Sequence, residues 1–343
     1  METMLFLAHT DPDGGLPGAA LEALGAALDL AAALGGVRVH GGLVGGDVQG
    51  GGNAMAGAGF ARMLGVGGDV FREARYATDS LAAEAVCRAS GASLVVAPAT
   101  SRWARVLPGV ACRLGGRSDT HVTALEADPG GVVVSRSFYR QRMEARLRRA
   151  ERPWVLLVDP GSHRRWAGEA GTAAVESVPV ALEEAGVRTR VLGFEAPPAD
   201  QQTIRPDASL LFVAGAGWTK RQADGQSHAA EAEALILDFL RRTQASLGGS
   251  KSLVDLSGEG HAVLPFMSYL NQVGQTGASP RHPKGLATCC HGEEPHVVGW
   301  RFVSERRAVN LDPNCGWARG KADVVYVADA FAVLARVNEL LSA

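Results

Sequence analysis

The sequence is poor in cysteine and carries little net charge. Its five cysteines include no Cys-x-x-Cys pair. An odd and sparse set of this kind excludes a disulfide framework and a zinc ribbon, and it is typical of a reducing cytoplasm. The formal net charge is −2. This balance gives no electrostatic basis for binding nucleic acid or a membrane surface.

Long apolar runs and a basic leader are also lacking. No apolar stretch is long enough to cross a bilayer, and the first residues, Met-Glu-Thr-Met-Leu-Phe-Leu, carry no positive charge. We therefore expect a cytoplasmic protein without membrane insertion. What the chain has in quantity is glycine, 43 of 343 residues, together with a hydrophobic content of 46%. This composition suits closely packed α/β layers in two domains.

The N-terminal half alternates buried strands with helices. Strands are predicted at residues 4–9, 37–44, 92–100, 132–135 and 154–158, and helices at 19–34, 79–90 and 101–114. Asp79 or Ser80 is the expected N-cap of the second helix. Continuous apolar strands that alternate with helices predict a parallel sheet covered on both faces.

An arginine-rich segment, residues 136–149, interrupts this pattern with six arginines. It could bind nucleic acid or phosphate, or it could be a helix that faces solvent or a partner. Because the rest of the half is not basic, we favour the helix and regard it as a docking face.

A polar segment, residues 199–206, follows the Pro-Pro pair that ends at Pro198. It is the expected linker, with Pro197 marking the boundary between domains 1–197 and 198–343. Beyond it, an apolar strand at 210–214 enters a glycine turn at Gly217, and a helix is expected at 229–247. Further strands are expected at 253–255, 307–313 and 322–327, with a closing helix at 329–341.

Polar residues recur where these C-terminal strands end. The set is Ser250, Thr276, His296, Asn310 and Asp329. Open α/β sheets bind ligands at the carboxyl ends of their strands, so we expect a nucleotide site there. The loop Gly274-Gln275-Thr276 is central to it, because glycine exposes backbone N–H groups and the two side chains add hydrogen-bonding groups.

These residues resemble the alpha subunit of the electron transfer flavoproteins. In the C-terminal half the resemblance lies in Val-Gly-Gln-Thr-Gly at 273–277, Ala-Val-Asn-Leu-Asp-Pro at 308–313 and the stretch 322–331. In the N-terminal half it lies in residues 96–100 and 107–111. The resemblance implies a doubly wound C-terminal domain that binds FAD and an N-terminal α/β domain that contacts a beta subunit.

The resemblance also implies function and site residues. The chain would be an electron carrier rather than a stand-alone catalyst, taking electrons from a flavin or iron–sulfur dehydrogenase, with AMP, where present, in the beta subunit. Thr276 would lie near the flavin N5 and His296 near its O2, while Asn310 and Asp329 would hold the adenosine end. The full FAD-binding set would be Gly217, Ser250, Lys251, Val273, Gly274, Gln275, Thr276, His291, Gly292, His296, Asn310 and Asp329.

Three departures from the family pattern stand out. The family's Gly-Arg-Gly turn reads Gly-Ala-Gly at 215–217, a family Ser-Gly-Ala-Ile-Gln-His reads His-Gly-Glu-Glu-Pro-His at 291–296, and the connection 254–272 is longer than usual. One cation is lost and two acids are gained. Since a cation stabilises an anionic flavin and acids oppose it, we predict a lower flavin potential than is typical of the family.

Other functions remain open for these segments. A structural subunit that keeps the fold but binds FAD weakly, or binds another nucleotide, is the main alternative. A metal at Cys289, Cys290, His291 and His296 is disfavoured, because adjacent cysteines suit a single tetrahedral site poorly. A Cys–His nucleophile is disfavoured because a cysteine on a strand more often packs in the core. A role in an amine or betaine demethylase assembly is a hypothesis from the divergence alone.

Overall fold

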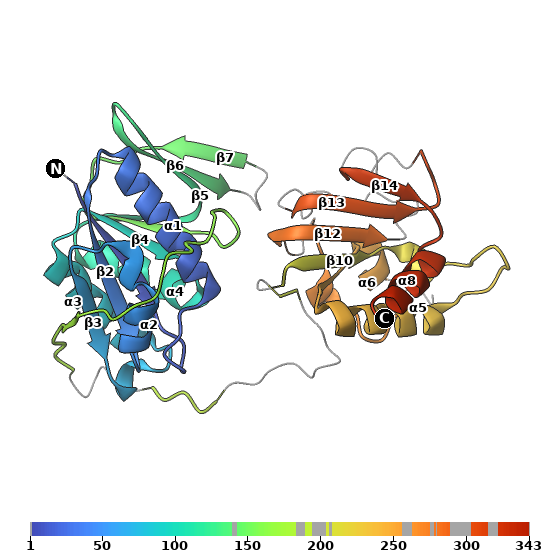
Figure 1. The fold of residues 1–343 in the computed structure, drawn as a ribbon, viewed down its shortest axis with the longest axis horizontal. Coiled ribbons are helices and arrows are strands. Elements are labelled where there is room, and N and C mark those ends of the chain that lie inside the picture. Colours follow the sequence, from blue (N-terminus) through green and yellow to red (C-terminus); the bar gives the residue numbers. More distant parts are fainter. Residues whose placement is uncertain are drawn as a thin grey trace. The chain divides into compact units, whose positions relative to one another are not determined.

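The chain folds into two compact α/β units, residues 1–194 and 195–343 (Figure 1). The computed structural model describes residues 2–138, 143–182, 189–193, 204–205, 208–255, 263–274, 278, 280–288, 303–314 and 322–342. The boundary predicted at Pro197 lies outside these residues. No described helix is both long and apolar enough to span a bilayer.

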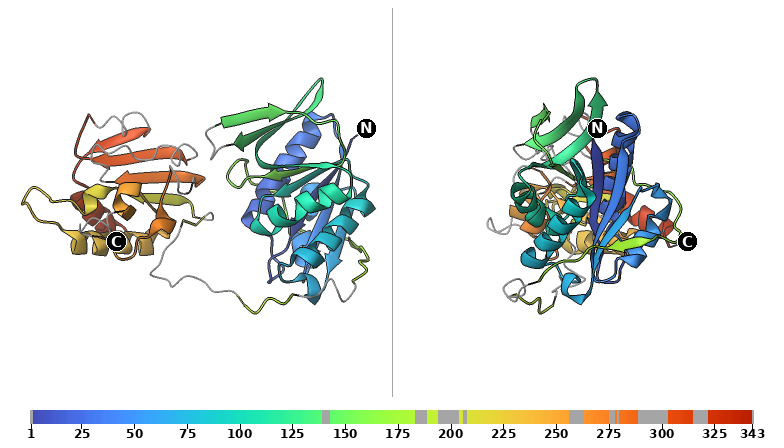
Figure 2. Two further views of the ribbon diagram at one scale, coloured as in Figure 1. Left: turned by 180° about the vertical axis from the view of Figure 1, so that it is seen from behind. Right: turned by 90° about the vertical axis from the view of Figure 1, so that its left-hand side faces the viewer.

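The N-terminal unit is built on a nine-stranded sheet with the order β7-β6-β5-β8-β4-β1-β2-β3-β9. Its strands are β1 Thr3–His9, β2 Arg38–Gly45, β3 Met63–Gly67, β4 Leu94–Pro98, β5 Arg117–Asp128, β6 Gly131–Phe138, β7 Met143–Leu147, β8 Trp154–Val158 and β9 Val175–Ser177. Its helices are α1 Gly18–Ala33, α2 Gln49–Ala54, α3 Tyr76–Ser90 and α4 Ser101–Arg113. The predicted parallel sheet is therefore confirmed, and β6 and β7 extend it antiparallel (Figure 2).

Successive side chains of β1 lie on opposite faces of the sheet, and each face has its own hydrophobic core. Met4 and Phe6 pack in the core beneath α1, whereas Leu5 and Leu7 pack in the core with α3 and α4. All four side chains are fully buried. A strand buried on both faces reads as the continuous apolar run seen in the sequence.

The predicted helix over residues 136–149 is wrong, because the described part of this segment forms β6 and β7. Its described arginines meet acids on β5, which lies beside β6 and is separated from β7 by β6. Arg146 pairs with Glu126, Arg148 pairs with Asp128, and Arg136 and Arg149 both bind the buried Asp119. Opposite charges that meet across a sheet stabilise the pairing of its strands. Because these arginines already bind acids, they are little available to nucleic acid.

Two smaller predictions also fail. The helix α3 begins at Tyr76, so Asp79 lies inside its first turns rather than at its N-cap. The expected strand at 253–255 is the end of a short helix, α6 Lys251–Asp255, and the strand comes earlier, as β11 Ser246–Gly249. The glycines at its end did not break the strand because β11 is fully buried beside β10 Leu210–Ala214.

The C-terminal unit is built on a five-stranded parallel sheet with the order β11-β10-β12-β13-β14. Its remaining elements are β12 His282–Thr288, β13 Val303–Asn310, β14 Val324–Val327, α5 Ala229–Thr243 and α8 Ala330–Leu340. Side chains of α5 and α8 pack with Phe212 and Ala214 on one face, while Leu211 and Val213 face the other. The parallel α/β sheet is confirmed, and its strand order, which reverses at β10, is that of the predicted doubly wound architecture.

Candidate functional site

The strand order of the C-terminal sheet defines a switch point between β10 and β12. The chain passes from β10 outward to β11, then returns to the other side of β10 to form β12, β13 and β14. In open parallel sheets the connections leave a crevice at such a reversal, at the carboxyl ends of the strands. The candidate site is therefore the edge formed by the ends of these strands.

One group of predicted residues meets at the end of β11. The N–H of Ser250 donates to the carbonyl of Ala214, 2.9 Å away, which ties it to the end of β10. The N–H of Val273 donates to the carbonyl of Gly249 at 3.0 Å. The structure thus brings Ser250, Val273 and the neighbouring Lys251 and Gly274 together, although they come from two separate stretches of sequence.

Gly274 has a structural reason for being glycine. Its φ of +81° lies in the left-handed region, where a side chain is strained. Its N–H donates to the carbonyl of Ala278 at 2.7 Å, and the N–H of Ala278 donates to the carbonyl of Gln272 at 2.8 Å. These bonds close a tight turn on the buried Gln272. The predicted contacts Gln275 and Thr276 lie outside the described residues.

A second group of predicted residues meets at the ends of β13 and β14. Asn310 is 1% exposed and its side-chain oxygen accepts from the N–H of Asp312 at 3.1 Å. The carbonyl of Asn310 accepts from the N–H of Ala328 at 3.2 Å. Asp329 directly follows Ala328 in the sequence, so this bond brings Asp329 close to the end of β13. Asp329 caps α8 by accepting from the N–H of Phe331 at 2.8 Å. The remaining predicted contacts, His291, Gly292 and His296, lie outside the described residues.

The turn after β10 holds a contact that the sequence did not predict. The indole N–H of Trp218 donates to the hydroxyl of Thr288 at 2.8 Å, and both side chains are buried. Since Trp218 follows β10 and Thr288 ends β12, this bond crosses the switch point. Trp218 also packs on Phe331 of α8, with ring centroids 4.5 Å apart. The sequence offered one signal for this contact. Trp218 directly follows the Gly-Ala-Gly turn that contains Gly217.

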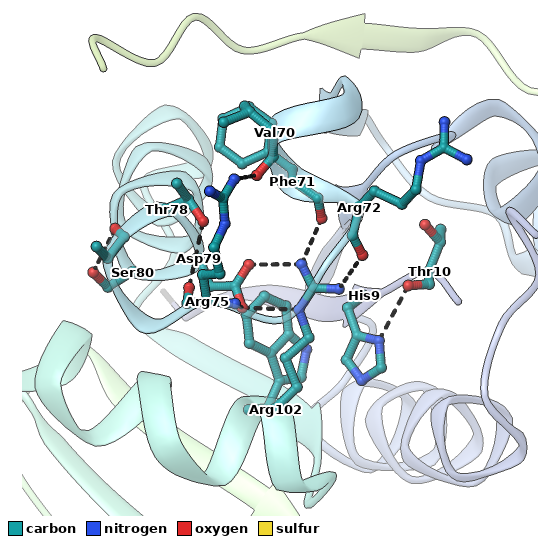
Figure 3. Close-up of polar contacts among 12 residues, drawn as sticks. His9, Thr10, Val70, Phe71, Arg72, Arg75, Thr78, Asp79, Ser80 and Arg102 are labelled. Carbon is teal, nitrogen blue, oxygen red and sulfur yellow. Dashed lines mark hydrogen bonds and ion pairs between the residues drawn. The ribbon is translucent and has the colours of Figure 1, made fainter. Parts of the chain in front are cut away.

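A second polar cluster lies at the carboxyl edge of the N-terminal sheet, between β1 and β4 (Figure 3). It centres on Arg102, whose guanidinium binds both carboxylate oxygens of Asp79 at 2.9 and 2.6 Å and the carbonyls of Phe71 and Arg72. Burial raises the pKa of Asp79, and the bonds from Arg102 oppose that rise. These bonds engage the guanidinium of Arg102 within the unit. We therefore assign the cluster a structural role, in which it holds α4 against α3 and the segment at Phe71.

His9 lies beside Arg102 in the same cluster. Its Nε2 is 2.9 Å from the hydroxyl of Thr100, and its ring meets Trp103 edge-on. Burial, reinforced by the positive charge of Arg102, lowers the pKa of His9 to about 4. The imidazole is therefore neutral at physiological pH. It forms its hydrogen bond with Thr100 without a buried charge.

Comparison with family models gives one match, to the electron transfer flavoprotein domain, over residues 4–183. Comparison with curated proteins gives no match. The matched stretch covers just over half of the 343 residues and falls within the N-terminal unit. The proteins of this family are flavoproteins that carry electrons. On this match the chain belongs to the electron transfer flavoprotein domain family.

Proposed function

We propose that this chain is the FAD-binding, alpha-type subunit of a heterodimeric electron transfer flavoprotein. The observation that carries the proposal is the order β11-β10-β12-β13-β14, which creates a switch point in the half of the chain that lies beyond the family match. Family membership supplies the flavoprotein role, and the strand order supplies a place for the cofactor. A beta-type subunit, with AMP where present, completes the proposed carrier.

The residues at this edge fit an elongated ligand. Ser250 follows β11, whereas Asn310 ends β13 and Asp329 follows β14. Three to four strand spacings separate the two groups, roughly 14–19 Å. A compact ligand reaches one group at most, while a dinucleotide can reach both. In this proposal Ser250, Lys251 and the turn at Gly274 hold the flavin end, and Asn310 and Asp329 hold the adenosine end.

The chain's own contribution is to hold and orient the cofactor, which supplies the electron-transfer chemistry. In this proposal the turn at Val273 and Gly274 lies beside the flavin end, and its two N–H groups are already bound to the carbonyls of Gly249 and Ala278. Ala216 is 3% exposed within the 3₁₀ turn Ala216–Trp218, so this turn presents no guanidinium to the site. Less positive charge near the ring favours the neutral over the anionic reduced cofactor, which supports the lower potential expected from the sequence.

The proposed electron donor is a flavin or iron–sulfur dehydrogenase, within an amine or betaine demethylase assembly or outside one.

No nucleic-acid partner is proposed, since the described arginines of segment 136–149 bind acids of this unit. Arg149 and Arg136 converge on Asp119 at 2.5 and 2.7 Å. Burial alone would raise the pKa of Asp119, but hydrogen bonds from Arg149, Trp154 and Arg136 lower it below its ordinary value.

The test is purification of the chain with its co-expressed beta-type partner, followed by release and quantification of bound flavin. We expect one FAD per heterodimer. Asp329→Asn keeps an N-cap on α8 yet removes a charge, so it should weaken FAD binding with little change in melting temperature. Ser250→Ala should weaken it as well. Ser209→Ala, beside the amino end of β10, is the matched control and should bind FAD normally.

The alternative is a structural subunit that keeps the fold and binds FAD poorly. The observation that favours it is Ala216, which stands where the family has an arginine. A heterodimer that purifies colourless and stays apo after incubation with FAD would establish this alternative. A yellow heterodimer whose FAD affinity is unchanged in Asp329→Asn and Ser250→Ala would retain the carrier role but place the cofactor elsewhere.

A further inference from the structure

An apolar cavity of about 510 Å³ lies in the C-terminal unit, between α8 and the face formed by β12, β13 and β14. Its walls are mostly aliphatic. They include Val309, Tyr326, Ala328, Val333 and Val337. Val333 and Val337 are one helical turn apart, so they share the side of α8 that faces the sheet. Cavities of this size and lining hold small molecules. This cavity lies over the face of the sheet, whereas the proposed cofactor lies at its carboxyl edge.

Charged side chains line the cavity toward the amino ends of the strands. Lys284 lies beside Glu305 on the neighbouring strand, and Arg307 lies one pleat further along β13, beside Leu286. Among the described residues, none of these three charged side chains forms an ion pair. Two cations and one acid, all of them exposed, give the described side chains at this end of the cavity a net charge of +1.

The two ends of the cavity therefore differ in chemistry. Toward the carboxyl ends of the strands it is lined by Val309, Ala328 and Val333, and toward the amino ends it carries the cations. A ligand that matches both ends has an unbranched apolar chain and a single negative charge at one terminus. A neutral lipid would leave the cations unmatched, and a dianion would meet repulsion from Glu305.

We propose that this cavity binds an aliphatic monocarboxylate. The alkyl chain lies between α8 and the sheet, against Val309, Val333 and Val337, and the carboxylate accepts hydrogen bonds from Lys284 and Arg307. Burial of the alkyl chain in this apolar lining supplies the hydrophobic part of the affinity. Hydrogen bonds to a charged group add to this and select the acid over the alcohol.

The test uses dodecanoate, below the concentration at which it forms micelles, titrated calorimetrically into the full-length chain and into its heterodimer. We expect one site per chain in both. The double variant Lys284→Gln, Arg307→Gln should weaken dodecanoate about tenfold, which corresponds to about 1.4 kcal/mol for the two charge-assisted bonds together. Binding of 1-dodecanol should not change. Arg336→Gln, on α8 but outside the cavity, is the matched control.

A cavity-filling variant supplies the second measurement. Val337→Trp should abolish binding of dodecanoate and of 1-dodecanol alike. The proposal is overturned if dodecanoate binding survives both the charge and the filling variants, if no saturable single site is found, or if dodecyltrimethylammonium binds equally well. Binding to the free chain that is lost in the heterodimer would also overturn it, because the cavity is then covered by the partner subunit.

Discussion

Arg102 and Asp79 form a bidentate ion pair in the N-terminal unit, with Nε–Oδ2 and Nη2–Oδ1 distances of 2.9 and 2.6 Å. Their side chains are 7% and 0% exposed. The pair joins α4 to α3, and the same guanidinium binds the carbonyl of Phe71. A buried pair of this kind is weak evidence for net stability, but loss of one partner leaves an uncompensated charge.

We therefore expect Arg102→Met alone to lower the free energy of unfolding by about 3–5 kcal/mol. Asp79→Leu combined with Arg102→Met should recover much of that loss, because both charges then leave the interior. Guanidinium unfolding followed by tryptophan emission measures the effect. Arg62→Gln is the control, since Arg62 and Glu176 are 42% and 49% exposed and a solvent-exposed ion pair contributes little to stability. Equal effects at the two sites would contradict the prediction.

The stability of the N-terminal unit should fall as pH drops from about 6.5 to 4. The pKa of His9 is lowered by burial to about 4, so the unfolded chain takes up a proton in this window while the folded chain does not. The loss is at most about 3.5 kcal/mol, since each pH unit between the two pKa values is worth about 1.4 kcal/mol. Above pH 6.5 both states are neutral and no effect remains.

His9→Gln removes this titration and keeps a hydrogen-bonding group for Thr100, so it should flatten the pH dependence of unfolding. His40, whose pKa burial also lowers, contributes in the same direction and sets the residual slope. His228→Gln is the control, because the hydrogen bond that the ring of His228 donates to Asp224 raises the pKa of His228 and its stability effect has the opposite sign. An unchanged slope in His9→Gln would refute the assignment.

Gly25→Ala tests how closely the segment after β8 crosses α1. A Cβ at Gly25 would lie 2.5 Å from the carbonyl oxygen of Arg164. The N–H of Trp166 donates to the carbonyl of Leu21 at 2.9 Å, which holds this segment against the helix. Alanine in a helix interior usually gains about 1 kcal/mol over glycine. Here we expect a net loss instead, because a backbone atom must move.

The control for Gly25→Ala is Gly67→Ala, whose Cβ would meet its nearest neighbour at an ordinary 3.4 Å. Thermal unfolding should show a lower melting temperature for the first variant and little change for the second. A gain in stability for Gly25→Ala would mean that the crossing segment is not packed on α1 as described.

Thr288→Val should destabilise the C-terminal unit by about 1–3 kcal/mol, because the buried indole N–H of Trp218 loses its acceptor. Thr288→Ser keeps the hydroxyl and is the matched control. The two units have separate cores, so the unfolding transition of the N-terminal unit should stay unchanged. A shift of both transitions by the same amount would show that the units unfold together.

Local sequence pattern was enough to predict the α/β architecture. Residues 4–9 and 154–158 read as buried strands because both faces of the sheet are covered, and the structure confirms them as β1 and β8. The helix predicted over 136–149 is wrong because its arginines look solvated until their partners, Glu126, Asp128 and Asp119, are placed on β5 of the same sheet. That pairing depends on tertiary contacts that no local window contains.

The candidate site shows the same limit. Gly274 and Asp329 carry local signals, a turn glycine and a helix cap, and the structure assigns each of them that local role. The bond between Trp218 and Thr288 joins residues 70 positions apart, and it depends on the order of β10 and β12 in the sheet. Whether FAD occupies this edge stays a prediction for the flavin analysis proposed above.

The last strand of the N-terminal unit, β9, pairs with β3, which precedes it by more than a hundred residues. Until Val175 has left the ribosome, β3 exposes unpaired backbone groups to other nascent chains. Synthesis adds only about 5–20 residues per second, so this exposure lasts several seconds. Expression of a fragment that stops after β8 should therefore give aggregates, and holdase chaperones should favour the growing chain during that interval.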